Sequence, residues 1–275
     1  MIKEYYVGLI KLLVLFFKKK SFKNFVLFAK YIYPILILKK KTPGLIFKKE
    51  KNLYSISSSI SKKFYFYDKF RLLRYTHGGF ESVGKYLLKK YQIENLQIDQ
   101  NKIIIEVGCN VGELTYQFLK KKAKVYAFDL EEKALECLKL NCSNFKRLKY
   151  FNIGIWKNNG YKNFYSYPED ASSSFFKQKN YEIKKTKIIT LDSFMKKNKI
   201  KSVYLLKVEA EGAEPEVIYG LKNKLASIRF ISLDCGPERN GKTTIKEVAK
   251  FLKMNNFNIN VINNNCLAEN KKLIR

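Results

Sequence analysis

Residues 105–115, IEVGCNVGELT, decide the fold of this 275-residue chain. Their first four residues complete a short β-branched run at 102–108. This run ends in a glycine, which indicates a buried strand. A helical pattern follows, with Val111, Leu114 and Phe118 on one face. This order of strand, glycine turn and helix places a helix N-terminus, with free backbone N–H groups, at the carboxyl edge of a sheet. Open α/β folds bind their ligands at that edge.

The rest of the chain continues the alternation of strands and helices. Strands are predicted at 124–129, 148–156, 202–212 and 228–236, and helices at 113–122, at 131–142, from 214 and from 244. The last helix begins with Thr244 and Glu247, which have the spacing of a capping box. This rhythm predicts an α/β fold with a mainly parallel sheet and helices on both faces. Because the chain ends soon after 257–265, we expect the last strands of the sheet to be abbreviated.

Residues 1–70 are predicted to form an apolar, basic helical extension and a connector, with a second domain at 71–275. The apolar segments 5–17 and 25–38 are each interrupted by lysine and are shorter than the ~20 residues that cross a bilayer. Such helices either pack on the second domain or lie in a lipid interface, with their lysines among anionic headgroups. The serine-rich residues 50–65 are predicted to be the connector, with one short strand at its end.

The formal charge of +30 points to an anionic partner. The lysine excess, however, accompanies many Ile, Asn, Phe and Tyr residues, all of which have A/T-rich codons, so genome composition explains much of it. No specific nucleic-acid partner is therefore expected, and peripheral contact with an anionic membrane is kept as an alternative. Five cysteines without a CxxC pair and a single histidine argue against a metal site or a disulfide framework. A cytoplasmic location, with contact at most to the inner membrane surface, fits best.

The order of residues in the glycine loop indicates a cationic ligand. A dinucleotide fold would have G-x-G-x-x-G, whereas this chain has Glu106-x-Gly108-x-Asn110-x-Gly112. Asn110 replaces the glycine that makes room for a pyrophosphate, and Glu106 suits a positive charge. Asp129 ends the next strand, where a carboxylate accepts both hydroxyl protons of a ribose. S-adenosylmethionine, which has an ammonium, a sulfonium and a ribose, is the predicted cofactor.

Structural roles stay open for the two acids of this site. Glu106 alternatively caps the amides of the glycine turn, and Asp129 alternatively caps the helix at 131–142. Gly108 and Gly112 are expected to let the backbone turn sharply and a ligand approach without an intervening Cβ.

Five segments together resemble the FkbM family of S-adenosylmethionine-dependent methyltransferases. In chain order they are IIIEVGCNVGELT (103–115), VYAFDLEEKALECLKLN (125–141), ASSSFF (171–176), KIITLDSFM (187–195) and LLKVEAEGAEPEVIYGLKN (205–223). The resemblance covers residues 75–258, and its fourth and fifth segments are the most specific. It implies a Rossmann-like class I methyltransferase fold and methyl transfer, commonly to a hydroxyl of a sugar or related metabolite. It also implies that the third segment approaches the cofactor.

The predicted cofactor site combines the loop after the first strand with the ends of the next two strands. Its residues are Glu106, Gly108, Cys109, Asn110, Gly112, Asp129, Leu130 and Ile153. No metal is expected, and the predicted acceptor is a small molecule or a saccharide.

Transfer to a hydroxyl needs a base near the carboxyl edge of the sheet. The candidates are Glu209, Glu211 and His77, of which the histidine titrates nearest to neutrality. Glu209 stands where the family usually has an aspartate. Glu211 equally suits a bracing role in which it accepts backbone N–H groups. Lys207 is expected to pair with either acid.

Two other functions stay open. A nicotinamide-dependent oxidoreductase would use a similar fold, although Asn110 and Glu106 argue against it. A non-catalytic adaptor would keep the fold while its apolar N-terminal helices dock on a membrane.

Overall fold

The computed structural model describes residues 13, 16–17, 21–33, 44–58, 61–76, 78–167, 172–176 and 181–273. The chain divides into two compact units, unit 1 (Met1–Val83) and unit 2 (Gly84–Arg275). The domain boundary expected at residue 70 stays a prediction. Most of the first apolar segment, at 5–17, lies outside the described residues. Within the described part of the chain, no helix combines the length and the apolar composition needed to span a bilayer.

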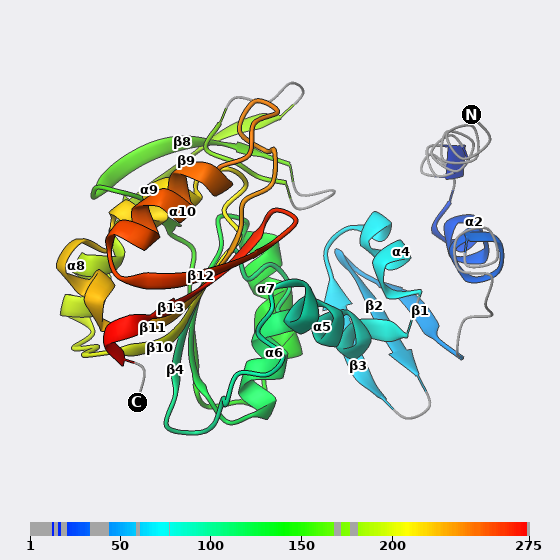
Figure 1. The fold of residues 1–275 in the computed structure, drawn as a ribbon. Helices are drawn as coiled ribbons and strands as arrows, with labels where there is room; N and C mark the ends of the chain where they lie inside the picture. The colour runs from blue at the N-terminus through cyan, green and yellow to red at the C-terminus, as the bar shows by residue number, and fades with distance from the viewer. Residues whose placement is uncertain are drawn as a thin grey trace. The chain divides into compact units, whose positions relative to one another are not determined.

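Unit 1 combines short helices with a three-stranded antiparallel sheet of order β1-β2-β3 (Figure 1). Its elements are α2 (Phe22–Leu27), the π-helix η1 (Phe28–Ile32), β1 (Ile46–Glu50), β2 (Leu53–Ser58), β3 (Ser61–Phe66), η2 (Lys69–Arg71) and α4 (Leu72–Tyr75). The segment expected to be a connector therefore forms two strands. Its apolar residues explain the difference, because Leu53, Ile56 and Phe64 are buried in the unit. Ser55, also buried, donates a hydrogen bond to Glu50 Oε1 at 3.0 Å.

Unit 2 is built on a seven-stranded sheet of order β12-β13-β11-β10-β4-β5-β6. The strands are β4 (Ile103–Val107), β5 (Lys124–Phe128), β6 (Leu148–Phe151), β10 (Val203–Val208), β11 (Ile228–Asp234), β12 (Phe257–Ile262) and β13 (Asn265–Asn270). Neighbours from β11 to β6 are parallel, and β13 pairs antiparallel with both β11 and β12. A second sheet of order β7-β9-β8 contains β7 (Gly154–Ile155), β8 (Gly160–Ser166) and β9 (Glu182–Ile189).

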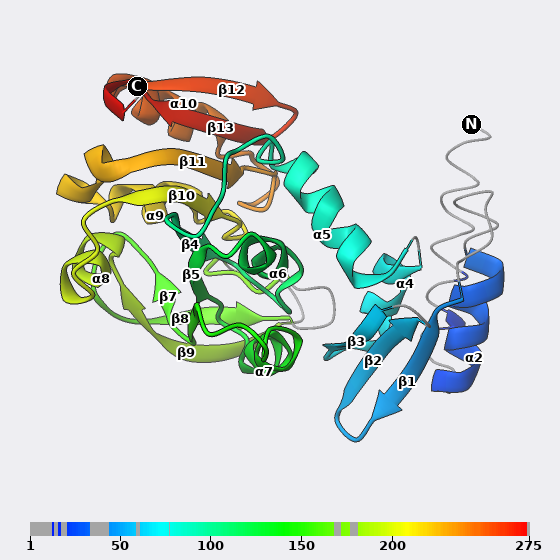
Figure 2. The same cartoon turned by 90° about the horizontal axis from the view of Figure 1, so that it is seen from below.

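Helices cover both faces of the large sheet, as the alternation predicts. They are α6 (Glu113–Lys120), α7 (Glu132–Asn141), α8 (Leu191–Lys197), α9 (Glu214–Tyr219), η3 (Lys222–Ser227) and α10 (Ile245–Met254), and η4 (Lys271–Leu273) follows β13. In Figure 1, α6 and α7 lie on one side of the sheet and α8, α9 and α10 on the other; Figure 2 shows the strands stacked in order between them. The helix α5 (Gly79–Lys90) crosses the boundary between the two units.

Two details of the sheet differ from the sequence-based expectation. The strand predicted at 148–156 is split, because β6 belongs to the large sheet and β7 pairs with β9 in the small one. The end of the sheet is not abbreviated, since β12 and β13 form a hairpin along its edge. Asn270 helps to fix this hairpin, because its side-chain amide donates to the Ala226 and Ile228 carbonyls at 3.1 Å each.

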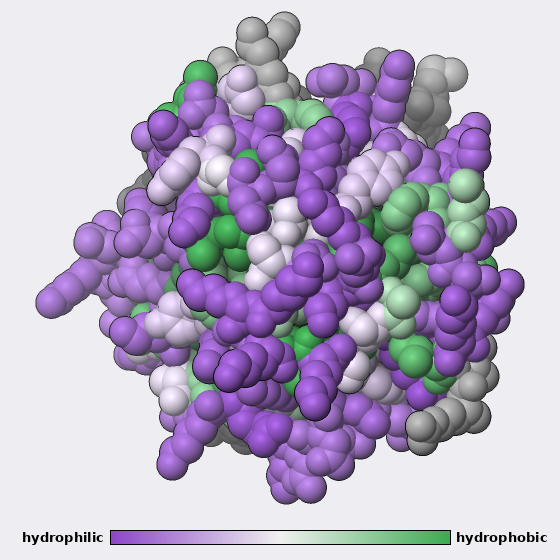
Figure 3. Space-filling view, turned by 90° about the vertical axis from the view of Figure 1, so that its left-hand side faces the viewer, coloured by the Kyte–Doolittle hydropathy of each residue, from purple (hydrophilic) through white to green (hydrophobic). Residues whose placement is uncertain are grey.

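One large part of the core of unit 2 lies between the sheet and α8, α9 and α10. Fully buried residues from the strands, such as Leu206 and Ile231, pack there against Val217 of α9 and Leu252 of α10. Figure 3 views the side of the molecule that carries α8 and α9, where hydrophobic side chains form small separate areas among hydrophilic ones. The apolar surface of these helices is thus used mainly inside the unit.

Replacing Gly84 by Ala should destabilise the protein. Alanine is favoured over glycine in a helix by about 1 kcal/mol, but a Cβ on Gly84 would lie 2.5 Å from the Glu113 carbonyl oxygen and 2.7 Å from Gln117 Nε2. Since a backbone atom of α6 cannot move cheaply, we expect a net loss of about 1–3 kcal/mol in the free energy of unfolding, measured in urea. As a control, Gly44→Ala meets no atom within 4 Å and should be near neutral. A stabilised Gly84→Ala protein would contradict the close packing of α5 on α6.

Candidate functional site

The loop between β4 and α6 turns sharply through three left-handed residues. The φ angles are 75° at Gly108, 48° at Asn110 and 91° at Gly112, a region that glycine and asparagine tolerate best. A Cβ on Gly108 would lie 2.0 Å from the Glu209 carbonyl oxygen, and one on Gly112 would lie 2.4 Å from Leu138 Cδ1. The glycines are therefore required by the turn and by close packing of the chain on itself. Room for a ligand is not needed to explain them.

Four backbone amides of this loop are bound within the protein. Gly108 and Cys109 donate to the Phe128 carbonyl at 2.9 and 3.1 Å, and Gly112 donates to the Cys109 carbonyl at 3.0 Å. Asn110 donates to Asp129 Oδ2 at 2.7 Å. These four amides are therefore not free donors for a ligand, and the expectation of free N–H groups in the first turn of α6 stays a prediction. Fewer donors thus remain at this loop for a bound phosphate.

Asp129 lies at the end of β5 and binds two backbone amides. Its Oδ2 accepts from Asn110 and its Oδ1 from Glu131 N at 3.0 Å. The N-cap of α7 is Glu131, so Asp129 does not cap that helix itself. Burial raises the pKa of Asp129 to about 6, although the hydrogen bonds from Glu131 and Asn110 oppose this rise. Each carboxylate oxygen keeps a second lone pair, so a role in holding a ribose stays a prediction.

Glu106 faces a lysine on the neighbouring strand. The register of β4 with β10 places Glu106 directly beside Lys207. Its Oε2 accepts a hydrogen bond from Thr115 Oγ1 of α6 at 2.5 Å. Burial raises the pKa of Glu106 to about 7, even though Lys207 and the Thr115 hydrogen bond act to lower it. A buried carboxyl group with this pKa would gain from a bound cation.

Lys207 joins the glycine loop to the turn that follows β10. Its side chain is only 2% exposed, and its Nζ donates to Glu209 Oε2 at 2.9 Å and to the Gly108 carbonyl at 3.1 Å. The expected pairing of Lys207 with one of the two acids is thus confirmed for Glu209. Burial would lower the pKa of Lys207, but Glu209 and Glu106 raise it above its ordinary value. The sequence signal for this residue is a lysine inside an otherwise apolar strand.

Glu209 and Glu211 occupy opposite electrostatic environments. Burial would raise the pKa of Glu209, but Lys207 and Lys90 bring it down to about 2. Lys90 itself pairs with Asp234 at 2.7 Å. For Glu211, burial and the neighbouring carboxylates, first Glu209 and then Glu238, raise the pKa to about 8. Glu209 is therefore a fixed anion at neutral pH, whereas Glu211 titrates near neutrality.

Glu214 braces the turn at 209–214, a role for which Glu211 was one candidate. Glu214 Oε1 accepts from the amides of Ala210 and Gly212 at 3.1 Å each. Its Oε2 accepts from the Thr244 hydroxyl at 2.9 Å. The predicted capping box at α10 is consequently wrong, because the Thr244 side chain makes no capping hydrogen bond.

Two other loops hold the carbonyls of this turn. The Ser174 hydroxyl donates to the Glu211 carbonyl at 2.8 Å, and Arg239 Nε donates to the Gly212 carbonyl at 2.8 Å. Arg239 also pairs with Glu216, and its guanidinium lies 4.3 Å from the centre of the Phe176 ring. The segment 172–176 thus reaches the turn beside Glu211. Sequence reasoning did not identify Arg239, which has no local signal.

Of the remaining predicted site residues, two are described by the structure and one is not. Leu130 and Ile153 are partly exposed, and the Leu130 carbonyl accepts from the Asn152 side chain at 2.9 Å. His77 lies outside the described residues, so its candidacy as a base stays a prediction. Among the residues that the structure describes, no group of His, Cys, Asp or Glu side chains could hold a metal ion.

The Glu211→Gln variant should lose part of the pH dependence of stability. A carboxyl pKa raised from 4.5 to about 8 stabilises the fold below the lower value, and this contribution disappears as the pH rises through the higher one. The free energy of unfolding of Glu211→Gln, relative to the unmodified protein, should therefore increase across that range. Urea titrations at several pH values measure it. The same change at Glu136, exposed on α7, should give no such trend, and a flat difference for Glu211→Gln would contradict the buried acidic environment.

Comparison with known proteins identifies the family. The FkbM methyltransferase domain model matches residues 88–259. The 2-O-methyltransferase NoeI of Sinorhizobium fredii (strain NBRC 101917 / NGR234) is 26% identical over 159 residues, which is 51% of this chain and 65% of that protein. The match therefore spans less than two thirds of this relative.

Two solved methyltransferase structures match this chain at low sequence identity. An rRNA methylase from Streptococcus thermophilus is 15% identical with a TM-score of 0.41, and the match covers 67% of this chain and 95% of that one. Magnesium protoporphyrin IX methyltransferase from Synechocystis PCC 6803, solved with bound SAM, is 14% identical with a TM-score of 0.42, over 72% and 83% of the two chains. At these scores the likenesses support no functional argument.

The strand order and the family match together confirm the expected Rossmann-like class I methyltransferase fold. Because the family model covers more than half of the chain, the protein belongs to the FkbM methyltransferase domain family.

Proposed function

We propose that this protein is an S-adenosylmethionine-dependent methyltransferase that methylates a hydroxyl group, most simply one on a saccharide. The observation that carries the proposal is a group of buried and partly buried carboxyls at the carboxyl edge of the sheet, within a chain of this family. Glu106 and Asp129 both have raised pKa values there, and four amides of the glycine loop are already engaged within the protein. This donor set suits a cationic ligand rather than a dinucleotide.

The residues present fit the proposed cofactor. S-adenosylmethionine supplies a methyl group on a positively charged sulfur, which a nucleophile attacks directly. Asp129 would hold the ribose through the lone pairs that its backbone partners leave open. Glu106 lies at the base of the same loop, where its negative charge favours the cationic ligand. Cys109, Leu130 and Ile153 would line the site, and their contribution is shape rather than charge.

Glu211 is the better candidate for the base that takes the hydroxyl proton. A general base works best when its pKa lies near the working pH, and that of Glu211 is raised to about 8. Glu209 has a pKa of about 2 and is paired with Lys207, so it is a weak base. Its role is to neutralise Lys207 and so to keep the glycine loop in place. The Ser174 and Arg239 hydrogen bonds hold the Glu211 backbone in its left-handed conformation, φ 48°.

The acceptor class rests on the family and on one relative. NoeI of Sinorhizobium fredii is named a 2-O-methyltransferase, which favours a hydroxyl acceptor for this chain as well. A neutral or amine-bearing sugar also suits an edge where Glu209, Glu211, Asp234 and Glu238 gather. A nicotinamide-dependent oxidoreductase is disfavoured by the family, and a non-catalytic adaptor would bind the cofactor without turning over any acceptor.

Asp129→Ala should weaken S-adenosylmethionine binding by about 1–3 kcal/mol, because it removes a charged hydrogen-bond acceptor. Isothermal titration calorimetry measures the affinity. Asp129→Asn keeps one acceptor oxygen and should lose less. Asp99→Ala, which removes an acid in an exposed turn, should bind the cofactor as the unmodified protein does. Unchanged affinity in Asp129→Ala would remove Asp129 from the site.

Glu211→Gln should slow methyl transfer about 10²- to 10⁴-fold, the usual range for losing a general base, while cofactor affinity stays the same. Transfer of labelled methyl groups to a panel of neutral oligosaccharides measures the rate. In the unmodified enzyme the rate should rise with pH through about 8, because the base must be ionised. If Glu209→Gln abolished transfer and Glu211→Gln did not, the assignment of the base would be wrong. Cofactor binding without any transfer would favour the adaptor.

A further inference from the structure

Unit 1 carries a helical face on which basic and apolar side chains are exposed together. In the continuous helix of α2 and η1, Lys23, Leu27 and Tyr31 follow at intervals of four and so lie on one face. Leu27 is 48% exposed, Tyr31 57% and the adjacent Ile32 42%. The Lys30 ammonium lies 5.6 Å from the centre of the Tyr31 ring. A single exposed apolar residue is ordinary, but three within one short helix indicate a contact surface.

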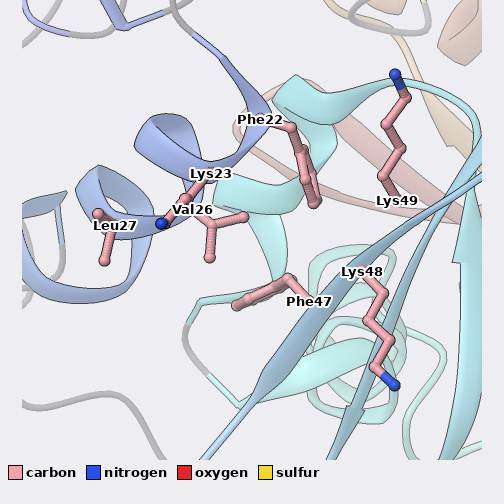
Figure 4. Close-up of a pocket in the computed structure, with 7 residues that line it drawn as sticks. All are labelled: Phe22, Lys23, Val26, Leu27, Phe47, Lys48 and Lys49. Carbon is pink, nitrogen blue, oxygen red and sulfur yellow. The ribbon is translucent and has the colours of Figure 1, made fainter.

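A hollow of about 400 Å³ adjoins this helix on the side of β1. It is lined by Phe22, Lys23, Val26, Leu27, Phe47, Lys48 and Lys49. Figure 4 shows Phe22, Val26 and Phe47 pointing into the space between α2 and β1, and the ammonium groups of Lys48 and Lys49 pointing away from it. The hollow therefore has an apolar interior and a basic rim.

The charge of unit 1 favours a negatively charged partner. Its described residues include ten that are basic, namely Lys23, Lys30, Lys48, Lys49, Lys51, Lys62, Lys63, Lys69, Arg71 and Arg74, against the acids Glu50, Asp68 and Glu81. Glu50 accepts from Lys63 at 2.9 Å, and Asp68 Oδ1 accepts from the Phe70 amide at 2.7 Å. No ion pair within the described part of this unit involves Lys23, Lys48 or Lys49.

We propose that α2, η1 and β1 form a docking surface for a bilayer that contains anionic phospholipid. Lysines on the rim would meet the headgroups, while Leu27, Tyr31 and Ile32 would enter the boundary with the acyl chains. A soluble polyanion such as a nucleic acid would pair with the lysines and could stack a base on Tyr31, but it would gain little from the aliphatic Leu27 and Ile32. The combination of both kinds of side chain on one face therefore favours a lipid surface.

Vesicle binding of the full-length chain tests this proposal. The partition coefficient is measured by co-sedimentation with phosphatidylcholine vesicles, with and without phosphatidylglycerol. Binding should require the anionic lipid and weaken as salt increases. The Lys23→Gln/Lys49→Gln protein should bind about tenfold to thirtyfold more weakly, since each lysine near an anionic surface contributes about fivefold. Leu27→Gln/Tyr31→Gln should also bind about tenfold more weakly, because it removes the inserted apolar surface.

A matched pair of lysines separates this surface from the general positive charge of the chain. Lys246 and Lys250 are exposed on α10 in unit 2, so their double change to Gln removes the same charge elsewhere. An equal loss of binding in that control would overturn the proposal. Unchanged binding by Leu27→Gln/Tyr31→Gln would also overturn it, because the attraction to the vesicles would then be electrostatic alone.

Cofactor titration of the same variants keeps this test separate from the enzymatic proposal. All four altered positions in unit 1 are exposed or on a rim, so folding and S-adenosylmethionine affinity should be unchanged. If neither the unmodified chain nor any variant bound S-adenosylmethionine, the proposed enzymatic function would be contradicted. The vesicle result would not be affected. Vesicle binding that is absent from the unmodified chain would contradict the docking surface alone.

Discussion

The buried ammonium of Lys207 is the interaction on which the site depends. A charge in the interior must be satisfied by partners, and removing one partner of a buried pair typically costs about 3–5 kcal/mol. Lys207 meets this need with the Gly108 carbonyl and the Glu209 carboxylate. One cation thereby ties the loop after β4 to the turn after β10. The same closeness explains Gly108, because any Cβ there would collide with the Glu209 carbonyl.

The two acids of that turn show how one short segment supplies two kinds of carboxyl. Glu209 and Glu211 are two residues apart, yet their pKa values are held near 2 and near 8. The difference comes from the direction of each side chain, toward the cations Lys207 and Lys90 in one case and among other carboxylates in the other. Pairs of acids whose environments drive their pKa values apart are typical of sites with separate electrostatic and proton-transfer roles.

The two units differ in chemical character. Unit 2 contains the whole of the family match and concentrates acids at the carboxyl edge of its sheet, in a chain with a formal charge of +30. Unit 1 lies outside that match, and its described part exposes lysines beside apolar side chains. An acidic site and a basic surface can thus coexist in one chain, because each is set by local residues rather than by the net charge.

The sequence by itself determined the fold class, the order of the main strands and helices and the location of the glycine loop. These follow from local signals: apolar periodicity, turn glycines and the acid-rich fifth segment of the family resemblance. Glu106, Asn110 and Asp129 were found in this way because each stands at a recognisable place in a strand or turn. Lys207 stood out in the sequence as a charged residue in an apolar strand. Its partner could not be predicted, because Gly108 lies 99 residues away.

Only the tertiary structure decided which groups satisfy one another. It assigned the bracing of the 209–214 turn to Glu214 and bound the Thr244 hydroxyl to Glu214 instead of to its own helix. It also brought Ser174 to the Glu211 carbonyl and Arg239 to the Gly212 carbonyl. It also showed that the serine-rich segment forms strands and that the sheet ends in a complete hairpin. The physical reason is that hydrogen bonding and burial depend on neighbours brought together by packing, whereas a local pattern reports only on residues close in the chain.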